Sequence, residues 1–187
     1  MTNAHQPSYL IVFGDSYSDP GNYHKGRTGR DRGYWHGRFT NGPNWSDYLS
    51  ACFGRPVLNF AVGGAIIDNS LPPADAVLSL PRVPDGRDAP PGDGSRVGGE
   101  PRHCYTVGSV PSICDQIDAF VADVPRYTKY VPGSVAIIAP GGNDFIWLTG
   151  PVRPQSDCIL LKFAEEATCT LIRRAQVLVD KGIKRIV

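Results

Sequence analysis

Three positions in this sequence combine residue types that can carry out acyl transfer. Ser16 stands in the turn Gly14-Asp15-Ser16, Gly64 follows Gly63 in a second turn, and Asn143 follows Gly142 in a third. Each turn comes directly after a short apolar run, which places it at the end of a predicted buried strand. A serine hydroxyl, a backbone N–H and an asparagine amide gathered at one point are what attack on an ester carbonyl requires.

The chemistry assigns different work to the three residues. The Ser16 hydroxyl is the predicted nucleophile, and the tetrahedral oxyanion formed by its attack needs donors already aimed at it. The side-chain amide of Asn143, the N–H of Gly64 and the N–H of Ser16 can supply three such donors. Adjacent glycines also occur in plain strand-to-helix turns. The pair Gly63 and Gly64 alone therefore does not distinguish an oxyanion donor from such a turn.

The elements that must position these residues alternate between strand and helix. Apolar runs predict four strands, at 10–13, 57–60, 134–139 and 183–187. A strand–helix alternation of this kind indicates an α/β domain with a parallel sheet. Because right-handed crossovers bring the carboxyl ends of parallel strands to one edge, we expect the three turns to converge on one pocket there.

Helix signals separate the predicted strands. Apolar residues at helical spacing predict a helix over 43–53, with Pro43 in its first turn and Gly54 at its stop. The pair Ser112 and Asp115 has capping-box spacing and begins a second helix. A third helix is predicted over 157–180, ending at Gly182, from an apolar stripe at Leu160, Phe163, Ala164, Ala167, Leu171, Ala175 and Leu178.

Two long segments have no apolar periodicity. The polar, glycine-rich loop at 23–41 contains Tyr34, Trp35 and Phe39, which are expected either to contact substrate or to cover the core. Residues 71–110, rich in proline and glycine, are expected to form an irregular insertion.

Composition excludes several classes of function. The chain has 187 residues and a formal net charge of +1, so no basic field attracts nucleic acid. No apolar run approaches the roughly 20 residues that span a bilayer, and no secretory signal is recognisable at the amino end. Five cysteines without a C-x-x-C pair make a zinc site or redox dithiol unexpected. Cys104 and Cys114 are a conceivable bridge only in a secreted protein.

The three turns, taken in order, resemble the conserved blocks of a known enzyme family. FGDSYSDPGN, NFAVGGA and GGND are similar to blocks I, II and III of the GDSL, or SGNH, hydrolases, which are serine esterases and lipases. GRFTNGPNWSDYL and PSICDQIDAF resemble segments of plant and fungal members, and NFAVGGAIIDNSL resembles fungal carbohydrate acetylesterases. The resemblance covers nearly the whole chain apart from 71–110.

This resemblance implies a fold and a set of roles. The implied fold is a flavodoxin-like three-layer α/β sandwich with a parallel sheet, formed here as a single SGNH hydrolase domain over 1–187. The implied site is Ser16 as nucleophile with Gly64 and Asn143 as oxyanion donors, and it needs no metal or organic cofactor. Asp15, Asp19, Asn22 and Asp144 are expected to brace the turns.

One part of the family's machinery has no counterpart in the sequence. The family's general base is a histidine in a late Asp-x-x-His block, and none of the histidines His5, His24, His36 and His103 stands in one. We therefore expect a chain that carries the N-terminal portion of the domain and has low stability and activity by itself. A serine is a weak nucleophile without a base, so His24 and His36, in the loop after Ser16, are retained as alternatives.

The leading hypothesis is hydrolysis of carboxylic esters, namely short acyl or acetyl esters of carbohydrates or lipids, through an acyl-serine intermediate. The alternative is an inactive remnant that binds glycan or lipid through the aromatic loop around Trp35. A flavodoxin-like nucleotide binder is disfavoured because neither G-x-G-x-x-G nor a P-loop lysine motif is present. The compartment is left open: cytoplasmic by default, secreted in many relatives.

Overall fold

The computed structural model describes residues 9–23, 34–71, 110–123, 131–144 and 157–187. Its four strands form one sheet in the order β2-β1-β3-β4, and every neighbouring pair is parallel. This is the strand order of the flavodoxin-like doubly wound fold, so the predicted α/β class is confirmed. The strands are β1 (Leu10–Gly14), β2 (Val57–Asn59), β3 (Val135–Ala139) and β4 (Arg185–Ile186).

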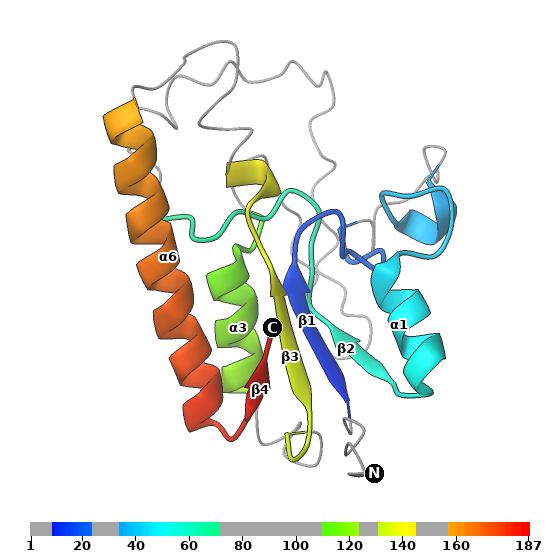
Figure 1. Cartoon of the computed structure of the whole chain (residues 1–187). Helices are drawn as coiled ribbons and strands as arrows, with labels where there is room; N and C mark the ends of the chain where they lie inside the picture. The colour runs from blue at the N-terminus through cyan, green and yellow to red at the C-terminus, as the bar shows by residue number, and fades with distance from the viewer. Residues whose placement is uncertain (1–8, 24–33, 72–109, 124–130, 145–156) are drawn as a thin grey trace, which may run out of the picture.

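Helices lie on both faces of this sheet (Figure 1). Helix α1 (Trp45–Phe53) packs near β2 on one side, and α3 (Ile113–Ala122) and α6 (Asp157–Asp180) lie together on the other. The direction of the crossovers explains this arrangement. The chain moves one way from β1 to β2 and the opposite way from β2 to β3 and on to β4, so right-handed crossovers put α1 on one face and both α3 and α6 on the other. The reversal point lies between β1 and β3, where ligands bind in open α/β sheets.

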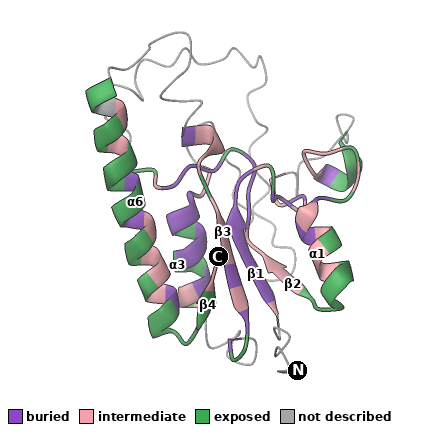
Figure 2. Cartoon of the chain, viewed as in Figure 1, coloured by how far each residue is buried: buried purple, intermediate pink, exposed green. Residues whose placement is uncertain are grey.

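The core lies between the sheet and the pair α3 and α6. Strand β1 is buried along its whole length, as its continuous apolar run predicts (Figure 2). The Phe13 ring lies 5.5 Å from that of Phe60 and 5.9 Å from that of Phe120, measured between centroids. Aromatic pairs at these separations add stability beyond their buried area. The carboxyl end of β1, which carries the predicted nucleophile, therefore rests on a rigid base.

Strand β3 is less buried than its apolar run predicts. Only Ala136 is fully buried, whereas Val135 and Ile137 are half-buried. The placement of the helices gives the reason: α3 and α6 cover one face of the sheet, while on the other face α1 packs on β2, and β1 separates β2 from β3. Among the described helices, none therefore covers β3 on that face.

Two predicted element boundaries are corrected by hydrogen bonds. Pro43 precedes α1 instead of forming its first turn, because Asn44 is the N-cap: its side chain accepts from two backbone N–H groups of the first turn. Strand β4 begins at Arg185 and not at 183, because the N–H of Ile183 still donates to the Leu178 carbonyl of α6, at 3.1 Å.

Other boundaries are as predicted. Gly54 ends α1 in the left-handed conformation with φ 58°, and Ser112 and Asp115 form the capping box of α3. The stripe of α6 is buried at Ala167 and Leu178, but Ala164 is exposed. Helix α6 extends beyond the end of the shorter α3, so its first turns have less to pack against (Figure 1). The expected insertion at 71–110 lies almost wholly outside the described residues. Cys104, one partner of the conceivable bridge, also lies outside them.

Candidate active site

The turn after β1 presents Ser16 at the carboxyl edge of the sheet. The Asp15 carboxylate accepts a hydrogen bond from the N–H of Tyr17 at 3.0 Å, and the Asp15 carbonyl accepts one from the N–H of Ser18 at 3.0 Å. These bonds close a tight turn in which Asp15 is buried and Ser16 is half-buried. Asp15 thus braces the turn, as expected from its place beside the serine.

Asp19 joins this first turn to the glycine turn after β2. Its carboxylate accepts from the N–H groups of Gly21 at 2.7 Å, Tyr23 at 3.1 Å and Gly63 at 2.7 Å, and also from that of Asn22. The Asp19 side chain is fully buried, so these donors replace water around it. Its role, like that of Asn22, is structural, as predicted.

The glycine turn brings Gly64 beside the β3 loop. Gly64 adopts φ +85°, a left-handed conformation that favours glycine, and it is exposed. The side-chain amide of Asn143 donates to the carbonyl of Ala65 at 2.8 Å, directly after Gly64. Asp144 is also tied to this segment, because its carboxylate accepts from the N–H of Ile67 at 3.1 Å. Asp144 anchors the β3 loop, as the sequence predicted.

The β3 loop also contacts the turn that carries Ser16. The N–H of Gly142 donates to the Asp15 carboxylate, and Asp15 is the residue before Ser16. All three turns are therefore connected: Asp15 to Gly142, Asp19 to Gly63, and Asn143 to Ala65. The predicted site residues Ser16, Gly64 and Asn143 each lie within one residue of these contacts.

Several donors in this cluster have no acceptor among the described residues. Among the described residues, none accepts a hydrogen bond from the N–H of Ser16 or of Gly64. Asn143 has two side-chain N–H donors, and one is bonded to Ala65. The arrangement can therefore offer three N–H groups to a bound acceptor.

Three buried carboxyl groups surround the turns. Burial raises the pKa of Asp15, Asp19 and Asp144 above the ordinary aspartate value, while backbone N–H donors act in the opposite direction. The pKa of Asp144 is raised further by the negative charge of Asp15. These carboxyls bond to backbone groups rather than to the Ser16 hydroxyl.

The aromatic loop beside the site covers the glycine turn. The Phe39 ring lies directly over Gly63 and contacts the rings of Tyr23 and Tyr34, with centroid separations of 5.5 and 5.4 Å. Trp35 keeps 37% of its surface exposed and holds the guanidinium of Arg38 4.7 Å from its ring centroid. Phe39 thus covers the glycine turn, whereas Trp35 and Tyr34 keep exposed ring surface.

His36 is the one histidine in the described part of the chain. It lies in the short helix η1 (Trp35–Gly37), is exposed, and has the positive φ of 47°. Its ring packs edge-to-face on Trp35 at 4.4 Å, and no described hydrogen bond joins it to Ser16. His5, His24 and His103 lie outside the described residues.

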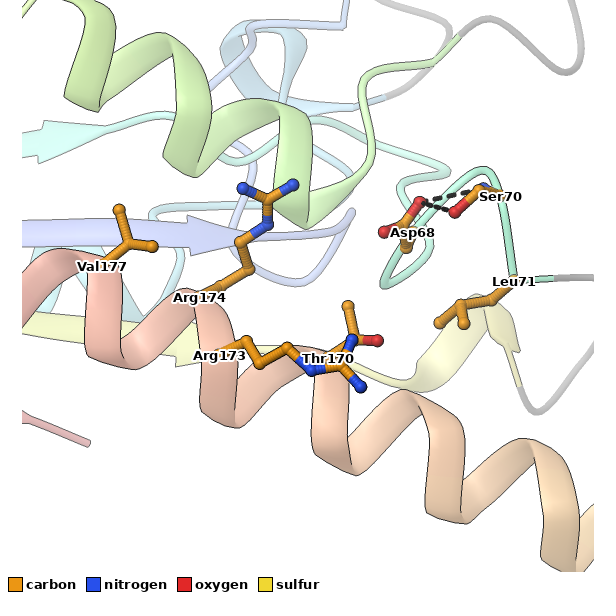
Figure 3. Close-up of a pocket in the computed structure, with 7 residues that line it drawn as sticks. All are labelled: Asp68, Ser70, Leu71, Thr170, Arg173, Arg174 and Val177. Carbon is orange, nitrogen blue, oxygen red and sulfur yellow. Dashed lines mark hydrogen bonds between the residues drawn. The ribbon is translucent and has the colours of Figure 1, made fainter.

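A cavity of about 340 Å³ lies elsewhere, between α6 and the loop at 68–71 (Figure 3). Its lining contains none of Ser16, Gly64 and Asn143. The carboxylate of Asp68 and the guanidinium of Arg174 both face it, and Arg174 forms an ion pair with Asp118 at 2.6 Å. Asp118 thus compensates the charge of Arg174, while Arg173 adds a further positive charge to the lining.

One polar residue that contacts the site was not predicted from the sequence. Gln116 in α3 is 3% exposed and hydrogen-bonds the Gly14 peptide that precedes Asp15 and Ser16. A glutamine within the buried face of an amphipathic helix was the available signal, since buried polar groups need partners.

The described residues contain no group of three or more histidine, cysteine, aspartate or glutamate side chains able to hold a metal ion. In the same residues, no helix combines the length and the apolar content needed to cross a bilayer.

Comparison with known proteins agrees with this geometry. The model of the family GDSL-like Lipase/Acylhydrolase matches residues 10–175, a range that contains β1, the glycine turn, the β3 loop and most of α6. No curated protein shows a significant match to the sequence. With the family model covering most of the chain, and a flavodoxin-like parallel sheet beneath the matched turns, the chain belongs to the GDSL-like lipase/acylhydrolase family of hydrolases.

Proposed function

We propose that this protein hydrolyses carboxylic esters through an acyl-serine intermediate. The Ser16 hydroxyl attacks the ester carbonyl, and the N–H groups of Ser16, Gly64 and Asn143 stabilise the oxyanion. The alcohol then leaves with a proton, and water releases the acid from Ser16 by the same route in reverse. The observation that carries the proposal is the connection of three turns at one sheet edge, with three donors in them left unbonded by the described residues.

The hydroxyl of Ser16 needs a base to accept its proton. The buried carboxyls of Asp15 and Asp144 bond to backbone N–H groups, and His36 packs on Trp35. We therefore assign the base to a histidine outside the described residues, as the family's mechanism implies. The carboxyls next to Ser16 hold the turns and do not take the proton.

Exposed aromatic side chains around the turns support a proposal for the substrate class. Tyr17, next to the nucleophile, is 75% exposed, and Trp35 and Tyr34 have exposed ring surface on the neighbouring loop. Aromatic surfaces of this kind bind the apolar faces of sugars and acyl chains. Together with the resemblance to fungal acetylesterases, this favours acetyl or short acyl esters of carbohydrates, with lipid esters as the second class.

The experiment is active-site labelling of the protein expressed from its complete coding sequence. A fluorophosphonate probe should form an adduct that mass spectrometry maps to Ser16, and Ser16→Ala should abolish it. Ser70→Ala is the matched control, because Ser70 is exposed and, among the described residues, bonds only to Asp68 of its own loop. Turnover of p-nitrophenyl acetate, acetylated oligosaccharides and a triglyceride then ranks the substrates.

An unlabelled Ser16 in the folded wild-type protein would contradict the proposal. Saturable binding of a glycan or lipid without turnover would instead favour a binding protein that uses the surface of Trp35 and Tyr34. Loss of that binding in Trp35→Ala would then identify the surface.

A further inference from the structure

Gln116 holds the last peptide of β1 from beneath the candidate site. Its side-chain oxygen accepts from the N–H of Gly14 at 2.9 Å, and its side-chain nitrogen donates to the carbonyl of Gly14 at 3.0 Å. The same nitrogen donates to the carbonyl of Pro111 at 3.3 Å, ahead of α3. The side-chain amide of Gln116 thus pairs with both backbone groups of Gly14, its N–H and its carbonyl.

Gly14 has little freedom to move away from this partner. A Cβ atom at Gly14 would lie 3.0 Å from the hydroxyl oxygen of Ser18 and 3.1 Å from the carbonyl oxygen of Ala139. The strand end therefore fits closely between β3 and its own following turn. Without Gln116 the buried N–H of Gly14 would lose this acceptor, and a buried donor left unsatisfied is costly.

The same helix also fixes the glycine turn. The first N–H groups of α3, those of Ile113 and Cys114, donate to the carbonyls of Ile66 and Ile67 at 2.9 and 3.1 Å. The Gly14 carbonyl also accepts from the N–H of Val62 at 3.1 Å. The start of α3 is therefore bonded both to the turn of the nucleophile and to the turn of the oxyanion donor.

We propose that Gln116 is a positioning residue, which sets the distance between the Ser16 hydroxyl and the N–H of Gly64 by holding the Gly14 peptide. This inference rests on the proposed ester hydrolysis. An error of about 1 Å in such a placement lowers a rate on the order of a hundredfold. Because Gln116 lies below the turns and touches no substrate, its loss should lower kcat and leave KM nearly unchanged.

Two substitutions separate positioning from general support of the fold. Gln116→Met keeps the length of the side chain but removes both bonds to Gly14, and we expect kcat to fall about ten- to a hundredfold. Gln116→Glu restores both bonds only when its carboxyl is protonated, because the acid then has one acceptor oxygen and one O–H donor. Ionisation places a second acceptor against the Gly14 carbonyl.

The pH profile is the readout that a merely structural role would not produce. Burial raises the pKa of a carboxyl at such a site. The ratio of kcat for Gln116→Glu to kcat for wild type should therefore be near one at low pH and fall as pH rises through that pKa. Gln176→Met is the matched control, since Gln176 lies exposed on α6 and its side chain bonds, within the described part of the chain, only to Asp180.

Hydrogen exchange at the Gly14 amide gives a second readout that does not need activity. We expect faster exchange in Gln116→Met, and in Gln116→Glu only above the pKa of the new carboxyl. An active wild type with an unchanged kcat in Gln116→Met, or a pH-independent ratio for Gln116→Glu, would overturn the role of Gln116. If Gln116→Met does not fold, the pH dependence of kcat in Gln116→Glu tests the role of Gln116. A wild type that is inert to ester and phosphonate, with the exchange pattern as expected, would overturn the proposed function alone.

Discussion

The contact between Gly63 and Phe39 gives a quantitative test of how the aromatic loop holds the glycine turn. A Cβ atom at Gly63 would lie 2.2 Å from Cε2 and 2.4 Å from Cζ of the Phe39 ring, so Gly63→Ala forces the ring to move. The ring is confined by Tyr23 and Tyr34. Overpacking of this kind costs about 1–3 kcal/mol of the free energy of unfolding.

A double-mutant cycle assigns that cost to the ring. Phe39→Ala removes the clashing atoms, so Gly63→Ala should be nearly neutral in the Phe39→Ala background. The expected coupling energy between the two substitutions is therefore about 1–3 kcal/mol, well above the roughly 0.5 kcal/mol within which independent sites add. Urea unfolding of the four proteins, followed by tryptophan fluorescence, measures each free energy.

Gly64→Ala is the control for this cycle. Its Cβ would meet only the Val110 side chain at 3.6 Å, but Gly64 has φ +85°. The cost, about 1–2 kcal/mol, then comes from the backbone and should be the same with and without the Phe39 ring. Additive costs for Gly63→Ala and Phe39→Ala would refute the assignment of Phe39 as a covering residue of the turn.

Two further predictions concern the oxyanion donor and the start of α1. Asn143→Ala should lower kcat for p-nitrophenyl acetate on the order of a hundredfold or more with KM nearly unchanged, measured by steady-state kinetics; equal kcat would exclude Asn143 as a donor. Asp47→Asn should lower the free energy of unfolding by about 1 kcal/mol at pH 7, because it removes the carboxylate that accepts two hydrogen bonds from Arg38, at 2.7 and 2.8 Å. Since Arg38 holds the pKa of Asp47 below 3.8, this stabilisation is complete above pH 3.8 and is lost as pH falls through the folded pKa. Urea midpoints of both proteins should therefore converge in acid, and a pH-independent difference would contradict the ion pair.

The local features of the fold were accessible from the sequence because their causes are local. Short apolar runs predicted the strands of the sheet, and Ser112 with Asp115 predicted the start of α3, because each signal lies within a few residues of its effect. The boundary predicted from Pro43 was wrong. A proline suits a first turn, but the side chain of Asn44 accepts from two backbone N–H groups and makes the helix begin at Trp45.

Long-range contacts were not accessible in the same way. The bond between Gln116 and Gly14 joins residues 102 positions apart, and no periodicity in either segment indicates it. The packing of Phe39 on Gly63 also depends on how the loop after β1 folds back. Composition left two roles open for this loop; the structure places Phe39 over the glycine turn, and substrate contact by Trp35 stays a prediction.

Some N–H groups of the site have no hydrogen-bond partner among the described residues. These groups support the assignment of acyl transfer to the site. Asp15, Asp19 and Asp144 each accept backbone N–H groups from a neighbouring turn, so the backbone of this sheet edge is held by buried carboxylates. The N–H groups of Ser16 and Gly64 have no partner among the described residues, and the bond from Asn143 to Ala65 fixes the plane of the amide that carries a third donor. Donors held in advance need no reorganisation when charge develops on an oxyanion, which is the condition for lowering the barrier of acyl transfer.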